Sequence, residues 1–175
     1  MAELRGAQRK FDEAIALYEK LVAHAPRPDL QQALGDLYVF MGKPDRAKPW
    51  VEKARIGYLD SVQRGEVHYF HHLASFFADV REEPAEAVKY ARLDLKLRQT
   101  PAAHEALAWA LFRAGEFAQA ATEIRPALVP RGASAHVYYH ASLIFSAAGD
   151  FETGRKYLRE TFALNPHYNE FHVHR

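Results

Sequence analysis

Two short segments, Arg113-Ala-Gly-Glu-Phe117 and Ala147-Ala-Gly-Asp-Phe151, decide the fold of this chain. Their glycines, Gly115 and Gly149, lie 34 residues apart (149 − 115). An apolar stretch with helical spacing precedes each glycine, and a second one follows it. Glycine adopts a positive φ at little cost, so it suits a tight turn between two helices. The two segments therefore predict a repeating unit of two antiparallel helices.

The same frame extends over nearly the whole chain. A small residue recurs in each second helix, where the two helices of a pair are expected to approach most closely: Ala14, Ala47, Ala87, Ala120 and Gly154. Leu34, Gly35 and Tyr38, followed by Gly42, fit the pattern of a first helix and its turn. In this frame the sequence resembles the tetratricopeptide repeat family. The resemblance implies an all-α fold, a right-handed α-solenoid of antiparallel helix pairs with about four and a half repeats.

The resemblance also sets the expected domain organisation. We expect a single solenoid domain over residues 1–175. Its approximate units are residues 1–27, 28–65, 66–99, 100–132 and 133–166, followed by a tail at 167–175.

Two of these units depart from the regular repeat. The distance from Gly42 to Glu82, which stands at the equivalent turn, is 40 residues (82 − 42) rather than 34. The excess falls in residues 54–65, which still read as amphipathic helix, so the second helix of that unit should be about two turns longer. Pro49 predicts a kink or a late start in the same helix. In the third unit, the turn before Pro84 should be one residue longer than its equivalents.

The two ends of the chain are also irregular. Residues 1–9 are too few for a complete first helix, so the opening unit should leave an apolar face uncovered. We expect either that the chain is cut from a longer protein or that this face pairs with another molecule, including a second copy. In the tail, Tyr168 and Phe171 are expected to fold back over the last helix pair, unless the tail leads into further chain.

Composition excludes several classes of protein. The chain has 23 Lys and Arg against 22 Asp and Glu, so no strong electrostatic field points to nucleic acid. The sequence has no run of apolar residues long enough for a membrane span, and we expect no membrane insertion. Cysteine is absent, which excludes disulfides and thiolate metal sites in these residues and fits a cytoplasmic or a periplasmic protein.

The family resemblance places the binding face on the first helix of each pair, which lines the concave side of such arrays. Transferred by position, it gives these candidate partner-binding residues: Gln32, Asp36, Phe40, His71, Glu105, Trp109, Arg113, His136 and Tyr139. One subgroup of the family clamps a C-terminal carboxylate with lysines and asparagines on these helices. Here the matching positions include Gln32, His71 and Glu105, so an acidic peptide tail is not the expected ligand. An amphipathic or extended segment docking on Trp109 and Tyr139 fits better, and packing between repeats is the alternative role of Trp109.

The chain has 10 histidines, which is an excess for its length. His68, His71 and His72 stand at i, i+3 and i+4, a spacing that places at least two of them on one helical face and suits a metal site. His136 and His140 repeat the i, i+4 spacing, and Glu105 could supply an oxygen ligand from the neighbouring unit. The alternative is that these histidines pack between helices and form hydrogen bonds there.

No sequence motif of an enzyme stands out. The glycines are scattered singly, without a phosphate-binding loop, and no nucleophile elbow is present. We therefore expect a non-catalytic protein–protein interaction scaffold, without a cofactor, whose concave face binds a peptide or another protein. A metal-binding or metal-responsive helical protein that uses the histidines is one alternative. A repeat scaffold that self-assembles through its incomplete N-terminal repeat is another.

Overall fold

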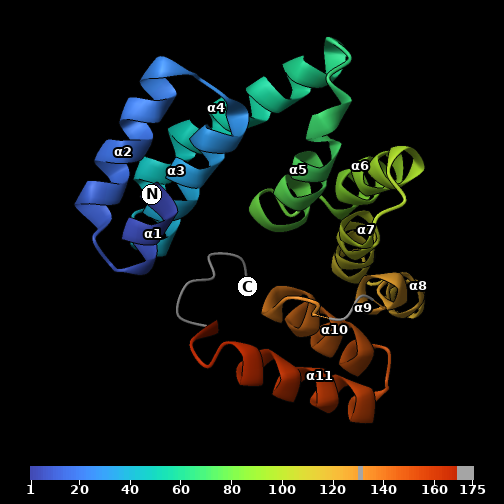
Figure 1. Ribbon diagram of the computed structural model, residues 1–175. Coiled ribbons are helices and arrows are strands. Elements are labelled where there is room, and N and C mark those ends of the chain that lie inside the picture. The colour runs from blue at the N-terminus through green and yellow to red at the C-terminus, as the bar shows by residue number, and fades with distance from the viewer. Residues whose placement is uncertain (130–131, 169–175) are drawn as a thin grey trace. The chain divides into compact units, whose positions relative to one another are not determined.

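The computed structural model describes residues 1–129 and 132–168 of the chain (Figure 1). Every regular element in these residues is a helix, which confirms the predicted all-α class. The helices form two compact units, of which the first is Met1–Val67 and the second begins at His68. The single-domain organisation expected from the sequence stays a prediction.

The first unit contains two helix pairs. Helices α1 (Ala2–Ala7) and α2 (Phe11–His24) form one, and α3 (Pro28–Phe40) and α4 (Pro44–Gln63) form the other. Helix α2 also packs on α3, so the two pairs share one apolar core. That core is built from Ala2, Ala14, Tyr18, Leu34, Leu37, Tyr38 and Ala47.

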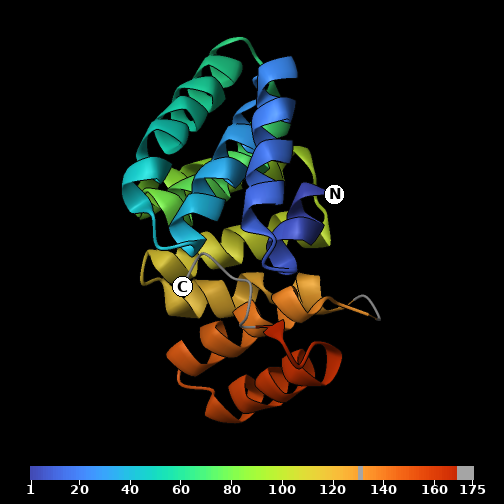
Figure 2. The ribbon, with the colours of Figure 1, turned by 90° about the vertical axis from the view of Figure 1, so that its left-hand side faces the viewer.

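The second unit contains three further pairs, which Figure 2 shows from the side. After a short 3₁₀ turn, η1 (Val67–Tyr69), helix α5 (Phe70–Ser75) continues into the π-helical turn η2 (Phe76–Val80) and packs on α6 (Pro84–Leu97). Helix α7 (Pro101–Arg113) pairs with α8 (Phe117–Glu123) and α9 (Arg125–Leu128). Helix α10 (Ala135–Ala147) pairs with α11 (Phe151–Leu164). The first helices of successive pairs are neighbours, because α7 contacts both α5 and α10.

The turn inside the pairs has one recurring geometry. At Gly115, φ is +79°, and the next amide, of Glu116, donates to the carbonyl of Leu111. A hydrogen bond between residues five apart also closes the turns at Gly42 and Gly149. In each turn this bond gives a partner to a carbonyl group at the end of the first helix. The turn after α1 has the same form with Arg9 at a φ of +59°. These contacts explain the glycine period that the sequence showed.

The longer turn of the third unit has a structural explanation. There the amide of Glu83 donates to the carbonyl of Phe77, a reach of six residues (83 − 77) rather than five. The π-helical turn η2 accommodates the extra residue, as the sequence spacing predicted. Glu82 takes the place of the turn glycine and has a φ of +53°, in the left-handed region that favours glycine.

Helix α4 confirms one prediction and corrects another. It has 20 residues, whereas α2, α6 and α11 have 14, so it is longer by about two turns of helix. It begins at Pro44 and runs through Pro49, so the late start suggested by Pro49 is wrong. Proline suits the first position of a helix, and four residues of α4 separate Pro44 from Pro49.

The small residues of the second helices are buried, as expected for sites of close approach. Gly154 in α11 lies close to α10, because a Cβ there would clash with the Ser146 hydroxyl and lie 3.0 Å from the carbonyl oxygen of Ser142. After α11, Tyr168 is buried and its ring lies 4.9 Å from that of Tyr139 in α10. The predicted fold-back of the tail is thus confirmed for Tyr168, whereas Phe171 lies outside the described residues.

The helices also bear on the question of a membrane span. Across residues 1–129 and 132–168, no helix combines the length and the apolar character needed to cross a bilayer.

Candidate functional site

The first helices of the second unit carry an interconnected group of polar and aromatic side chains. Helix α7 begins at Pro101, and the Thr100 hydroxyl caps it by accepting a hydrogen bond from the amide of Ala103. Ser134 caps α10 in the same way. These caps fix the start of each helix and therefore the direction of the side chains that follow. We call the surface formed by α5, α7 and α10 the first-helix face.

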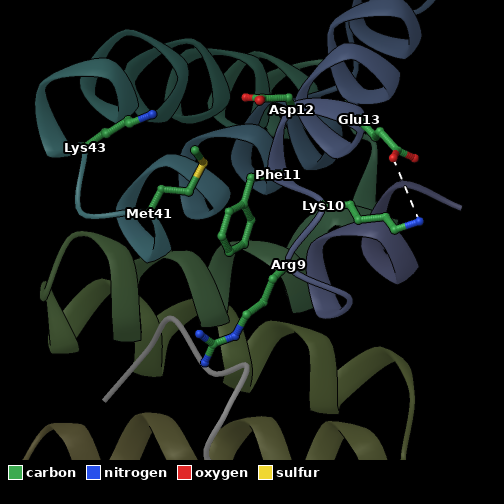
Figure 3. A pocket seen from close by; sticks show the side chains of 7 residues that line it. All are labelled: Arg9, Lys10, Phe11, Asp12, Glu13, Met41 and Lys43. Carbon is green, nitrogen blue, oxygen red and sulfur yellow. Dashed lines mark ion pairs between the residues drawn. The ribbon is translucent and has the colours of Figure 1, made fainter.

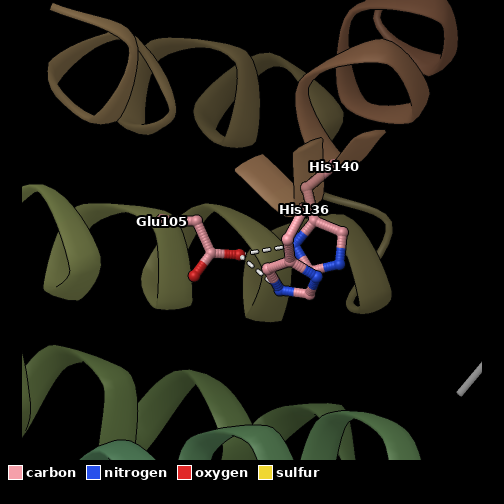
Figure 4. Close-up of side chains that lie close together, drawn as sticks. All are labelled: Glu105, His136 and His140. Atoms are coloured by element: carbon pink, nitrogen blue, oxygen red, sulfur yellow. Dashed lines mark hydrogen bonds and ion pairs between the residues drawn. The ribbon is translucent and has the colours of Figure 1, made fainter. Parts of the chain in front are cut away.

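Glu105 lies at the centre of this face, between α7 and α10. The Nδ1 atom of His140 donates to its Oε1 atom at 2.5 Å, and the Nε2 atom of His136 lies 3.7 Å from the same oxygen (Figure 4). Burial acts to raise the pKa of Glu105. The hydrogen bond from His140 and the imidazoles of His140, His136 and His71 outweigh this effect and hold the pKa below its ordinary value. Glu105 is therefore a carboxylate at neutral pH.

Tyr168 extends the group on the side of α10. Its hydroxyl lies 2.9 Å from Nδ1 of His136, and its ring packs on Tyr139. Burial raises the pKa of Tyr168, and Tyr139 and Glu105 raise it further, so the hydroxyl keeps its proton. The exposed His136 ring is thus held between a carboxylate and a phenol.

Trp109 is a packing residue of this face. Only 7% of it is exposed, and its indole stacks on His140 with ring centroids 3.8 Å apart and planes 4° apart. Its Nε1–H group donates to both carboxylate oxygens of Asp79 in η2, at 2.9 and 3.1 Å. Arg113 donates from Nε to the carbonyl of Ala78 at 2.9 Å. Trp109 therefore ties α7 to its two neighbours, which is the packing role that the sequence left open.

The predicted residues of the first unit lie on α3. Gln32 accepts a hydrogen bond from the hydroxyl of Tyr58 at 2.8 Å, and Asp36 is half-buried. The Phe40 ring lies 5.9 Å from that of Phe11 in an edge-on arrangement. The first unit also has an open pocket at the start of α2, which Figure 3 shows. Its lining residues are Arg9, Lys10, Phe11, Asp12, Glu13, Met41 and Lys43.

The three histidines predicted as a metal site do not converge. His68 lies in the 3₁₀ turn η1 with its ring tilted by 40° against that of Tyr69, and the ring centroids of His71 and His72 are 6.0 Å apart. His71 instead faces the buried Asp94 of α6, with Nδ1 3.7 Å from its Oδ2 atom. Among the described residues, these three histidines do not form a group with the spacing of a metal site.

Sequence reasoning missed the contacts that Asp79 and Tyr168 make in this group, whereas it named His140 as a candidate metal ligand beside Glu105. The i, i+4 spacing of His136 and His140 was a signal for His140. No local signal could have linked Asp79 to Trp109 or Tyr168 to His136, because these pairs lie 30 and 32 residues apart.

Comparisons with known proteins agree with this architecture. Residues 28–54 and 101–126 match family models of the tetratricopeptide repeat. No curated protein sequence matches the chain. Among solved structures, it resembles YrrB, "a TPR protein with an unusual peptide-binding site", at 19% identity and a TM-score of 0.53, over 96% of this chain and 84% of that one.

Two further solved structures are similar in fold. Nearly identical TPR-like repeats of a putative kinesin light chain from Podosopora anserina align at 17% identity and a TM-score of 0.58, covering 93% of this chain and 90% of that one. BtubC from P. vanneervenii aligns at 18% identity and a TM-score of 0.55, covering 98% of this chain and 79% of that one. At such identities the likeness concerns the fold.

Proposed function

We propose that this chain, a tetratricopeptide repeat protein, is a non-catalytic scaffold that binds another protein or a peptide on the first-helix face of its second unit. The repeats support the proposal, because a row of packed first helices offers an extended surface without a closed pocket. YrrB, which shares the fold, is described as having a peptide-binding site. The near balance of charge favours a protein partner over a nucleic acid.

The observation that carries the proposal is the exposed edge of the group around Glu105. His136 is exposed, and Tyr139 on α10 and His71 on α5 are half-buried on the two helices that flank α7. Each offers an aromatic ring together with a polar atom, a combination that gives large contact areas and directed hydrogen bonds at interfaces. Glu105 and Tyr168 hold the His136 ring in place, and Tyr168 also packs on Tyr139. This order before a partner arrives lowers the entropy lost on binding.

The structure changes which residues we propose as contacts. Trp109 supports the face from within, so the proposed contacts are His136 and Tyr139 on α10 and His71 on α5. The partner is not an acidic C-terminal tail, because a carboxylate would approach Glu105, which is already ionised. A segment with hydrogen-bond donors or apolar side chains is the better match.

Site-specific photo-crosslinking tests this proposal. A photoreactive phenylalanine analogue replaces the exposed His136 in one protein and the exposed Arg159, on the second helix α11, in the matched control. Both proteins are mixed with native lysate that contains a chelator, so that metal ions play no part. We expect a defined partner to be cross-linked from position 136 and not from position 159. The same products from both positions, or none from either, would contradict the proposal.

A further inference from the structure

The group around Glu105 has a second property, which does not depend on partner binding. Within residues 1–129 and 132–168, Glu105, His136 and His140 are the group of His, Asp or Glu side chains that meets the spacing of a metal site. One ligand atom from each lies within 4.8 Å of the other two. Figure 4 shows that the two imidazoles from α10 converge on one carboxylate oxygen of Glu105 from α7.

We propose that Glu105, His136 and His140 bind a divalent transition-metal ion, of which Zn²⁺ is the best match. Two imidazole nitrogens and one carboxylate oxygen form a donor set suited to Zn²⁺ and to neighbouring ions such as Co²⁺, Ni²⁺ and Cu²⁺. In a tetrahedral zinc site with bonds of about 2.0–2.1 Å, two ligand atoms lie about 3.3 Å apart.

The observed distances are close to this requirement. The gap between His136 Nε2 and Glu105 Oε1 is 3.7 Å and must close slightly. The gap between His140 Nδ1 and Glu105 Oε1 is 2.5 Å, a hydrogen-bond distance, and must open by roughly 1 Å. The ion takes the place of the proton between these two atoms, and that proton is released to solvent.

The surroundings hold both imidazoles in orientations that suit metal binding. The stacked indole of Trp109 fixes the ring plane of His140, with its Nδ1 atom directed at Glu105. The Tyr168 hydroxyl accepts a hydrogen bond from Nδ1–H of His136 when Nε2 binds the ion. Such outer contacts select the tautomer and raise the affinity of metal sites. Because His136 is exposed, an ion can reach the site from solvent.

A second His–Glu pair in the same unit provides a matched comparison. The Nδ1 atom of His104, on α7, lies 3.1 Å from Oε2 of Glu123, on α8, and both side chains are half-buried. This pair does not belong to a group of three ligands among the described residues. It therefore has the chemistry of a histidine–carboxylate contact without the third donor.

Calorimetric titration of the purified, tag-free protein with Zn²⁺ tests the proposal, and Co²⁺ absorption spectra report the ligand geometry. The tail histidines His172 and His174 are replaced by glutamine in every protein, so that they add no binding. The main variant is His136→Gln, because His136 is exposed and its loss should leave the fold intact. The matched controls are His104→Gln and His72→Gln.

We expect one Zn²⁺ per chain in the reference protein and a tetrahedral Co²⁺ spectrum. Affinity should fall by more than about 100-fold in His136→Gln, and by roughly 10-fold in Tyr168→Phe, which removes only an outer contact. It should be unchanged in both controls. Zinc should also raise the melting temperature of the reference protein but not of His136→Gln. No binding, equal binding by His136→Gln, or a loss confined to His72→Gln would overturn the proposal. None of these results depends on a protein partner, so the scaffold function is tested separately.

Discussion

Trp109 provides the sharpest test of how the second unit is held together. Trp109→Phe keeps an aromatic ring that can stack between His140 and Phe112, but it removes the Nε1–H group that donates to both oxygens of Asp79. A hydrogen bond to a charged acceptor contributes about 1.5–3 kcal/mol to stability, and the smaller ring leaves an additional gap in a buried site. We therefore expect the free energy of unfolding of Trp109→Phe to be lower than that of the wild type by at least about 2 kcal/mol.

The other tryptophan of the chain offers the same substitution as a control. Trp50 is half-buried in α4, and its ring lies 4.4 Å from Nζ of Lys53. Among the described residues, no acceptor is found for its indole nitrogen. Trp50 packs against the core of the first unit, so Trp50→Phe also leaves a gap, but it breaks no hydrogen bond to a charged acceptor. Its loss of stability should therefore be smaller than that of Trp109→Phe by about 1.5 kcal/mol or more.

Urea unfolding followed by far-UV circular dichroism measures both changes. Because each variant keeps one tryptophan, fluorescence reports the first unit in Trp109→Phe and the second in Trp50→Phe. A double-mutant cycle with Asp79→Ala isolates the hydrogen bond, since Asp79→Ala should destabilise less when Trp109 is already phenylalanine. If Trp109→Phe lost no more stability than Trp50→Phe, or if the cycle showed no coupling, the assignment of Trp109 as a packing residue would be refuted.

Three further predictions concern the backbone. Gly154→Ala should lower the free energy of unfolding by about 1–2 kcal/mol, because the new Cβ would lie 3.0 Å from the carbonyl oxygen of Ser142. This loss is expected although alanine is the better helix former. A urea midpoint at or above that of the wild type would contradict the close contact. Glu82→Gly should gain roughly 0.5–1 kcal/mol by relieving a φ of +53°, and thermal unfolding should show a higher midpoint. Pro49→Ala should raise the free energy of unfolding by about 1–2 kcal/mol, because alanine restores a backbone hydrogen-bond donor inside α4. A lower melting temperature than that of the wild type would contradict this prediction.

The sequence by itself determined the helix pairs, their turns and their irregularities. Turn glycines such as Gly115 and small residues such as Ala120 are local requirements, because a positive φ and a close helix approach restrict the residue types at those positions. For the same reason, the length of α4 could be predicted from the distance between Gly42 and Glu82. These features depend on residues near one another in the chain.

The tertiary structure decided which of the candidate polar side chains meet. Glu105 and His140 are 35 residues apart, and Asp79 and Trp109 are 30 apart, so their contacts exist only because successive first helices pack side by side. His68, His71 and His72 are near in sequence, yet among the described residues they do not form a group with the spacing of a metal site. Helical spacing fixes which residues share a face, whereas the packing of one helix on the next fixes which of them come within bonding distance.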